Sequence, residues 1–239
     1  MKQYILILWL YFFLVACQSI PEPREIIHSE LEQVFKDYEL MGLSVGLIAN
    51  GELYYSGSFG IANEARQQAM TPETYLRMAS ISKFFTSLAV MKLWEQGLVS
   101  LDTPASVYLG WKLINPGFPD QPITLRHLMD HRSGIRDGSG YGDFLQNMIS
   151  QKTHIRSLFM PDSTYYTGDM FADHPPGGYF QYTNCTWGLV ATIIEKISHH
   201  RFDQFCKEHL FDPMRINSSF NATDIPSDEM AALYRYRDS

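Results

Sequence analysis

Residues 74–83 of the 239-residue chain read TYLRMASISK and place Ser80 three residues before Lys83, at the start of a long apolar segment. The apolar spacing predicts a helix from Ser80 to Gln96, ended by Gly97. Side chains three residues apart share a helix face, so the serine hydroxyl and the lysine amine come within hydrogen-bond reach. A serine hydroxyl becomes a good nucleophile when a base removes its proton, and a neutral lysine amine can act as that base.

The S-x-x-K pattern by itself is weak evidence for catalysis. Residues of ordinary abundance give about one chance match in a chain of this length. The alternative interpretation is a helix cap followed by a surface lysine. The segments around the pattern therefore have to decide between the two interpretations.

The surrounding segments predict an α+β fold. Residues 24–39 carry apolar side chains at the helical period. Residues 43–49 and 52–59 flank Asn50-Gly51, which predicts a β-hairpin because both turn residues tolerate positive φ. Further elements are expected in this order: a short helix at 125–131 capped by Thr124, a helix at 143–150, a large surface loop at 160–181 and a helix at 184–199. No repeat or linker is evident, so one α+β unit is expected.

Five segments, in the same order, resemble the serine β-lactamase and penicillin-binding protein superfamily, and most closely its class C β-lactamase and esterase branch. They are residues 74–83, 97–104 (GLVSLDTP), 125–135 (LRHLMDHRSGI), 176–184 (PGGYFQYTN) and 188–198 (GLVATIIEKIS). The resemblance covers roughly residues 25–235. It implies a β-lactamase/transpeptidase-like fold, in which a helical region accompanies an antiparallel sheet.

The resemblance also implies a catalytic site. Tyr182-Thr183-Asn184 matches the family's Y-x-N motif. By that match Ser80 is acylated, Lys83 and Tyr182 act as base and proton shuttle, and Asn184 binds the amide carbonyl of the substrate. A phenol suits this role when a nearby cation stabilises the phenolate. The alternative is a core tyrosine followed by an asparagine helix cap, and for Asn184 the two interpretations are compatible.

No metal or cofactor is expected, and nucleic acid is not expected as a partner. The eight His and three Cys show no HExxH or paired C-x-x-C spacing, and no G-x-S-x-G elbow occurs. Residues 138–142 (GSGYG) lack the strand–helix context of a dinucleotide site. His127 and His131 lie in a segment that the family shares, and we interpret both as structural. The 26 acidic against 19 basic residues leave no basic face for phosphates.

The family's third motif, K-T-G or H-x-G on an edge strand, has no match after Asn184. That strand supplies the second N–H of the oxyanion hole, the first being that of Ser80, and loss of one such donor costs about 10²–10³ in rate. We therefore expect a C-terminally truncated domain whose last sheet strands are missing. A fragment, a frameshifted reading and a decayed gene remain alternative explanations.

The N-terminus has the features of an export signal. A positive start precedes the apolar run 4–15, which is too short to span a bilayer comfortably. The run ends in Leu14-Val15-Ala16-Cys17, which resembles the lipobox of bacterial lipoproteins. We expect a lipoprotein-type signal peptide at 1–16, lipidation of Cys17 and a tether at 17–23, followed by the hydrolase domain at 24–239. An ordinary signal peptide is the alternative.

These observations lead to two functional hypotheses. The first is an exported, membrane-anchored serine hydrolase of the periplasm or cell surface, acting without cofactor on a β-lactam, a D-Ala-D-Ala peptide or a small ester. Pocket loops set specificity, so family membership does not choose among these substrates. The second is a truncated, non-catalytic pseudoenzyme that binds cell-wall peptide or a partner.

Export also allows a Cys185–Cys206 disulfide, because an exported protein folds in an oxidising compartment, although two independent core residues are the favoured interpretation.

Overall fold

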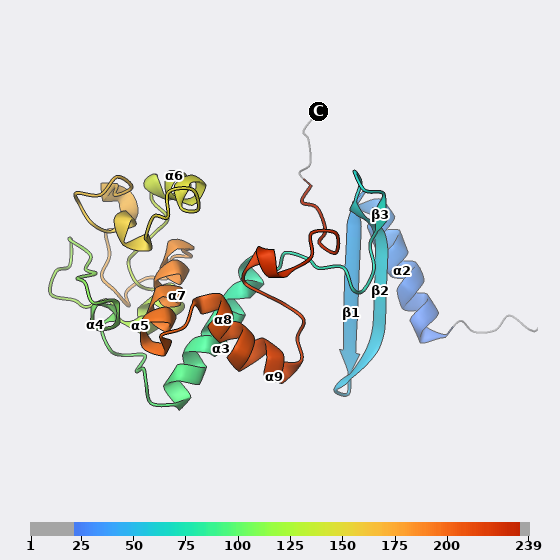
Figure 1. The fold of residues 1–239 in the computed structure, drawn as a ribbon, viewed down its shortest axis with the longest axis horizontal. Coiled ribbons are helices and arrows are strands. Elements are labelled where there is room, and N and C mark those ends of the chain that lie inside the picture. Colours follow the sequence, from blue (N-terminus) through green and yellow to red (C-terminus); the bar gives the residue numbers. More distant parts are fainter. Residues whose placement is uncertain (1–21, 235–239) are drawn as a thin grey trace, which may run out of the picture. The chain divides into compact units, whose positions relative to one another are not determined.

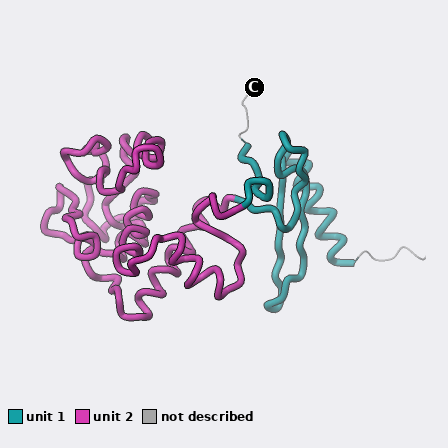
Figure 2. The backbone as a smooth tube through the Cα atoms, viewed as in Figure 1, with its two compact units in different colours: residues 1–76, 226–239 teal, residues 77–225 magenta. Residues whose placement is uncertain are grey.

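The computed structural model describes residues 22–234. The predicted signal peptide at 1–16, Cys17 and most of the tether lie outside these residues. Within the described range, no helix combines the length and the apolar character needed to cross a membrane. The chain forms two compact units (Figure 2): one holds the residues before Arg77 together with those after Ile225, and the other holds Arg77–Ile225. No linker composition marks either boundary, which is why the sequence predicts a single unit.

The first unit is built on the predicted hairpin (Figure 1). β1 (Gly42–Ala49) pairs antiparallel along its whole length with residues 52–60 of β2 (Glu52–Asn63), with a register shift between Leu47 and Ile48. Asn50 and Gly51 form the turn with φ of +52° and +81°, so the hairpin prediction is confirmed. A short third strand, β3 (Gln68–Ala69), pairs with β2 and gives the strand order β1-β2-β3.

Two segments from opposite ends of the chain complete the first unit. α2 (Pro23–Asp37), predicted at 24–39, packs on β2, and the ring centroids of Phe35 and Phe59 lie 6.1 Å apart. The segment after Ile225 returns to the residues that precede the nucleophile motif. Tyr75 donates its backbone N–H to Glu229 O at 2.9 Å and accepts the N–H of Ala231 at 3.0 Å. The sequence pattern gives no sign of this parallel bridge.

The second unit is helical. Its helices are α3 (Ser82–Glu95), α4 (Ala105–Leu109), α5 (Leu125–Met129), α6 (Gly140–Asn147), α7 (Cys185–Ser198), α8 (Phe202–Cys206) and α9 (Asp212–Met214). Short 3₁₀ turns lie at Ala79–Ile81 (η1), Ile155–Leu158 (η2), Gly168–Met170 (η3) and Ala222–Asp224 (η5), with a π-helical turn at Lys207–Phe211 (η4). α7 packs against α3, α4, α5 and α8 and buries Cys185, Thr186, Leu189, Val190, Ile193 and Ile194. Helices and a small antiparallel sheet together confirm the α+β class.

The predicted helices are present with shifted ends. The helix expected at 80–96 begins as η1 and continues as α3. Thr124 caps α5 as predicted: its Oγ1 accepts the His127 N–H at 3.2 Å, and His127 Nδ1 accepts the Thr124 N–H at 3.3 Å. α5 ends at Met129 and not at 131, because the backbone of His131 is left-handed with φ of +60°.

Two other expectations need adjustment. The helix expected at 143–150 begins three residues earlier, as α6, and ends at Asn147. Residues 160–181 are irregular apart from η3, as predicted, yet they are more than a surface loop. Tyr165 and Met170 are buried in the core of the second unit, so this segment contributes to its packing.

The two cysteines of the second unit are buried free thiols. Cys185 opens α7 and Cys206 ends α8, and neither forms a disulfide. Burial is the largest cause that raises the pKa of both thiols, that of Cys206 to about 12. The interpretation as two independent core residues is therefore confirmed, and the disulfide alternative is wrong.

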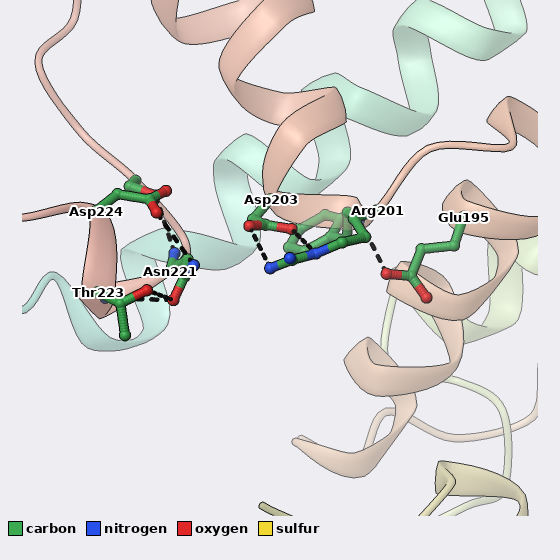
Figure 3. A network of polar contacts seen from close by, with 8 residues as sticks. Glu195, Arg201, Asp203, Asn221, Thr223 and Asp224 are labelled. Carbon is green, nitrogen blue, oxygen red and sulfur yellow. Dashed lines mark hydrogen bonds and ion pairs between the residues drawn. The ribbon is translucent and has the colours of Figure 1, made fainter. Parts of the chain in front are cut away.

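Polar contacts hold the last helices of the second unit (Figure 3). Glu195 accepts the N–H of Phe202, the first residue of α8, at 2.9 Å. Arg201 donates to both carboxylate oxygens of Asp203 at 3.1 and 2.8 Å. Asn221 accepts the N–H of Thr223 within η5. These contacts fix where each short element begins, which supports the packing of α8 against α7 and α3.

Candidate active site

Ser80 lies in η1, directly before α3, and is exposed to solvent. The preceding residue, Ala79, has φ of +43°, a left-handed conformation that is uncommon outside glycine and that clusters at functional sites. α3 is anchored in the core by Thr86, Ala89, Val90 and Leu93. Lys83 follows one turn after Ser80, and its Nζ donates to Ser80 Oγ at 3.1 Å. The S-x-x-K spacing thus produces the predicted contact.

The Y-x-N motif reaches the same pair from the segment that leads into α7. Tyr182 Oη lies 2.6 Å from Ser80 Oγ, and Lys83 Nζ donates to Asn184 Oδ1 at 2.9 Å. Lys83 Nζ also lies 4.9 Å from the centre of the Tyr182 ring, within the range of a cation–π contact. The structure therefore brings together all four predicted site residues, although the two motifs are 101–102 residues apart.

Of the two hydrogen bonds at Ser80 Oγ, the one from Lys83 has a defined direction, and in the other either hydroxyl can be the donor. A lysine ammonium only donates, so Ser80 Oγ accepts from Lys83 and its own proton is available to Tyr182 Oη. The Lys83 ammonium is the largest influence that lowers the pKa of the Tyr182 phenol, and the Ser80 hydroxyl acts in the same direction. A phenol with a lowered pKa gives up its proton more readily. This arrangement can therefore carry the serine proton to Tyr182.

His131 contacts the site, although its sequence context indicates a structural role only. Its ring stacks on Tyr182 with centroids 4.5 Å apart, and its Nδ1 accepts the Thr183 N–H at 3.1 Å. In the neutral ring the proton must then sit on Nε2. Burial, followed by the positive charge of Lys83, lowers the pKa of the imidazole. A neutral His131 thus supports the ring of Tyr182, while the His127 side chain accepts the Thr124 N–H in the α5 cap.

Asp137 is the second residue that sequence reasoning missed. Its carboxylate accepts N–H groups from Asn184 and from Cys185 at the start of α7. Asp137 lies in the loop between α5 and α6, 47 residues before Asn184, and no spacing in the sequence links the two. Only the folded structure shows that Asp137 contacts Asn184.

Within 22–234, no group of three or more His, Cys, Asp or Glu side chains could hold a metal ion. The cluster itself presents a hydroxyl, an amine, a phenol and an amide.

Known proteins resemble the chain over most of its length. A penicillin-binding protein of Bacillus subtilis (strain 168) is 31% identical over 175 residues, which are 71% of this chain and 35% of the relative. Protein flp of Staphylococcus aureus (strain MW2) is 23% identical over 219 residues, which are 91% of this chain and 42% of the relative. The chain thus spans between 35% and 42% of the length of these curated relatives.

Solved structures share the fold. The octameric penicillin-binding protein homologue from Pyrococcus abyssi is 28% identical with a TM-score of 0.69, covering 88% of this chain and 47% of that one. The beta-lactamase/D-alanine carboxypeptidase from Yersinia pestis has a TM-score of 0.67 over 87% of this chain and 58% of its own, and at 22% identity this likeness concerns the fold alone. The sequence profile of the beta-lactamase family matches residues 27–239. With the S-x-x-K and Y-x-N residues assembled as described, the chain belongs to the beta-lactamase family.

Proposed function

We propose that the chain is an exported serine hydrolase whose Ser80 forms an acyl-enzyme with a β-lactam, a D-Ala-D-Ala peptide or a small ester. The observation that carries the proposal is the continuous chain of hydrogen bonds from Asn184 through Lys83 and Ser80 to Tyr182. It joins a nucleophile to a proton acceptor within 2.6 Å, as general-base catalysis requires. The 31% identity to a penicillin-binding protein makes a penicillin the first probe.

The acylation step follows from the direction of these bonds. Ser80 Oγ attacks the carbonyl carbon of the substrate while its proton moves to Tyr182 Oη, held as a phenolate beside the Lys83 ammonium. The carbonyl oxygen becomes an oxyanion, which the Ser80 N–H in η1, directly before α3, stabilises. Asn184 binds the amide carbonyl of the substrate. When the tetrahedral centre collapses, the bond to the leaving nitrogen or oxygen breaks and Tyr182 returns the proton to it.

Deacylation repeats the sequence with water. Tyr182 takes a proton from the water that attacks the ester carbon of acylated Ser80. The bond from this carbon to Ser80 Oγ then breaks, and the proton returns to Oγ. The acid product leaves and the free serine is restored. No cofactor takes part in either half of this proposal.

Export and anchoring form part of the proposal. The apolar run at 4–15 and the Leu-Val-Ala-Cys sequence that ends it support a lipoprotein whose Cys17 carries the lipid. Such a protein would meet cell-wall peptide and small molecules at the outer face of a membrane. Cys17→Ser is expected to move the chain from the membrane fraction to the soluble fraction, and an unchanged distribution would contradict the anchor.

A non-catalytic protein that binds cell-wall peptide or a partner is the second candidate. The observation in its favour is that neither K-T-G nor H-x-G follows Asn184 in this sequence. A protein without the strand that carries this motif has one oxyanion donor fewer, which lowers the rate by about 10²–10³.

The intact mass of the purified chain, before and after incubation with a penicillin, separates the candidates. We expect an adduct of the mass of the drug on Ser80, absent from Ser80→Ala. A nitrophenolate burst from p-nitrophenyl acetate without a penicillin adduct would indicate an esterase. Neither adduct nor burst, from a chain that melts cooperatively, would contradict the enzyme and favour the pseudoenzyme.

A further inference from the structure

The Asp137 carboxylate accepts three N–H groups at the start of α7. The Asn184 backbone N–H lies 3.0 Å from both carboxylate oxygens, and the Cys185 N–H donates to Oδ1 at 2.8 Å. These two bonds satisfy backbone donors that have no partner inside the helix. The third donor is the side-chain amide of Asn184, whose Nδ2 donates to Asp137 Oδ2 at 2.8 Å. This third bond links Asp137 to the catalytic cluster.

The chemistry of the two neighbours decides which end of the Asn184 amide faces Lys83. An ionised carboxylate only accepts hydrogen bonds, and a lysine ammonium only donates them. The amide lies between them, with its NH₂ group toward Asp137 and its oxygen 2.9 Å from Lys83 Nζ. The reverse orientation would set NH₂ against the ammonium and oxygen against the carboxylate. We propose that Asp137 is a positioning residue that holds the Asn184 amide in this orientation and, through it, holds Lys83 beside Ser80.

The orientation of the Asn184 amide affects the reaction because it fixes the position of Lys83. Its Nζ donates to Asn184 Oδ1 at 2.9 Å and to Ser80 Oγ at 3.1 Å, so the amide oxygen is one of two acceptors that fix a long, flexible side chain. Asp137 is hydrogen-bonded to neither Lys83 nor Ser80. If the amide turned over, Lys83 would lose its acceptor and move. A displacement of about 1 Å in such a group can lower the rate about 10²-fold.

Two variants of the full chain test the inference, which depends on the proposed function for its kinetic consequence only. Asp137→Asn keeps one side-chain oxygen for the two backbone N–H groups, but its new NH₂ group donates and forces the Asn184 amide to turn. Asp130→Asn is the matched control, because it removes the same charge from the same loop. Asp130 Oδ1 accepts the N–H of Arg132 at 3.1 Å and has no hydrogen bond to the cluster.

Each variant is measured in two independent ways. The first is the rate constant for acylation of Ser80 by a penicillin or by p-nitrophenyl acetate, with KM determined alongside. The second is the ¹⁵N-correlated NMR signal of the Asn184 side-chain NH₂, assigned by its loss in Asn184→Ala. A thermal melt of each variant reports on folding.

We expect Asp137→Asn to lower the acylation rate constant about 100-fold, with a smaller change in KM and a shifted Asn184 NH₂ signal. Its melting temperature should stay near that of the unmodified chain, and Asp130→Asn should match the unmodified chain throughout. An unchanged acylation rate in Asp137→Asn would overturn the inference, whether or not the NH₂ signal moves. A lower melting temperature of Asp137→Asn without a lower acylation rate constant would likewise overturn the inference, because it would show that Asp137 only caps α7. If the unmodified chain is not acylated at all, the proposed function fails, and the NMR comparison still decides the amide orientation.

Discussion

The hydroxyl of Tyr182 is the single group whose removal tests the proposed mechanism most directly. Tyr182→Phe deletes the oxygen that lies 2.6 Å from Ser80 Oγ and leaves the ring. The phenyl ring can still stack on His131 and still lie 4.9 Å from Lys83 Nζ, so the surrounding packing is retained. The variant therefore separates the proton acceptor from the architecture that holds it.

The expected effects on rate and on stability differ in size. General acid–base catalysis contributes about 10²–10⁴ in rate. That range corresponds to about 3–5 kcal/mol of activation free energy. A lost hydrogen bond costs only about 0.5–1.5 kcal/mol of unfolding free energy, and the low end applies because Tyr182 is 48% exposed. The melting temperature should then fall by less than about 4 °C.

The assay is the burst of nitrophenolate from p-nitrophenyl acetate, followed as a function of pH. The Lys83 ammonium, and then the Ser80 hydroxyl, lowers the pKa of the Tyr182 phenol below its ordinary value. In the proposed mechanism the phenolate is the base, so the acylation rate of the unmodified chain should rise with pH as this phenol loses its proton. Tyr182→Phe should lose this rise. Tyr179→Phe, in the same segment but exposed and without a role in the cluster, is the control.

One result would refute the reasoning. If Tyr182→Phe acylated within about threefold of the unmodified rate and kept the same pH dependence, Tyr182 would not be the proton acceptor. The general-base contribution of about 10²–10⁴ would then belong to another group. Lys83, at 3.1 Å from Ser80 Oγ, would be the remaining candidate, and Lys83→Ala would identify it by the loss of the burst.

Three further predictions concern the framework of the site. Thr124→Ala removes the cap of α5 and should lower the unfolding free energy by about 1 kcal/mol in a urea titration. Ile193→Ala, at a position 1% exposed in α7, should cost about 2–5 kcal/mol in the same titration, and a smaller loss would indicate a site that collapses on the cavity. Stability should fall as pH drops below about 6.5, because burial lowers the folded pKa of His131 and the unfolded imidazole binds the proton first. His131→Asn, whose side-chain oxygen can accept the Thr183 N–H, should flatten this pH dependence, and an unchanged slope between pH 7.5 and 5 would contradict the assignment.

Much of the local structure could be predicted because it depends on neighbours in the sequence. Asn50-Gly51 determines the turn since both residues adopt positive φ at little cost. Thr124 caps α5 through atoms only three residues away. The predicted helix ends are less accurate. α5 stops at Met129 because the backbone of His131 is left-handed, and that conformation depends on what His131 contacts.

In the candidate site, too, some contacts could be predicted from the sequence and others could not. Residues of the S-x-x-K pattern are three apart, so helical geometry alone brings the Lys83 amine to the Ser80 hydroxyl. The Y-x-N residues could be named from a resemblance, but their place beside Ser80, 102 residues away, requires the folded second unit. His131 lies in a segment that the family shares and Asp137 in none of the matching segments, but neither pattern shows their contacts with Thr183 and Asn184, which exist only in three dimensions.

The sequence by itself therefore determined the family, the contact between Ser80 and Lys83, and the positions of the turn and the main helices. Short-range sterics, helical period and capping act between residues a few positions apart, and a linear pattern records them. The tertiary structure alone decided that the Asp137 carboxylate accepts the Asn184 amide NH₂, that the His131 ring stacks on Tyr182, and that residues 229–231 bridge to Tyr75. These contacts join distant segments whose approach depends on the packing of the whole unit, and no local pattern encodes that packing.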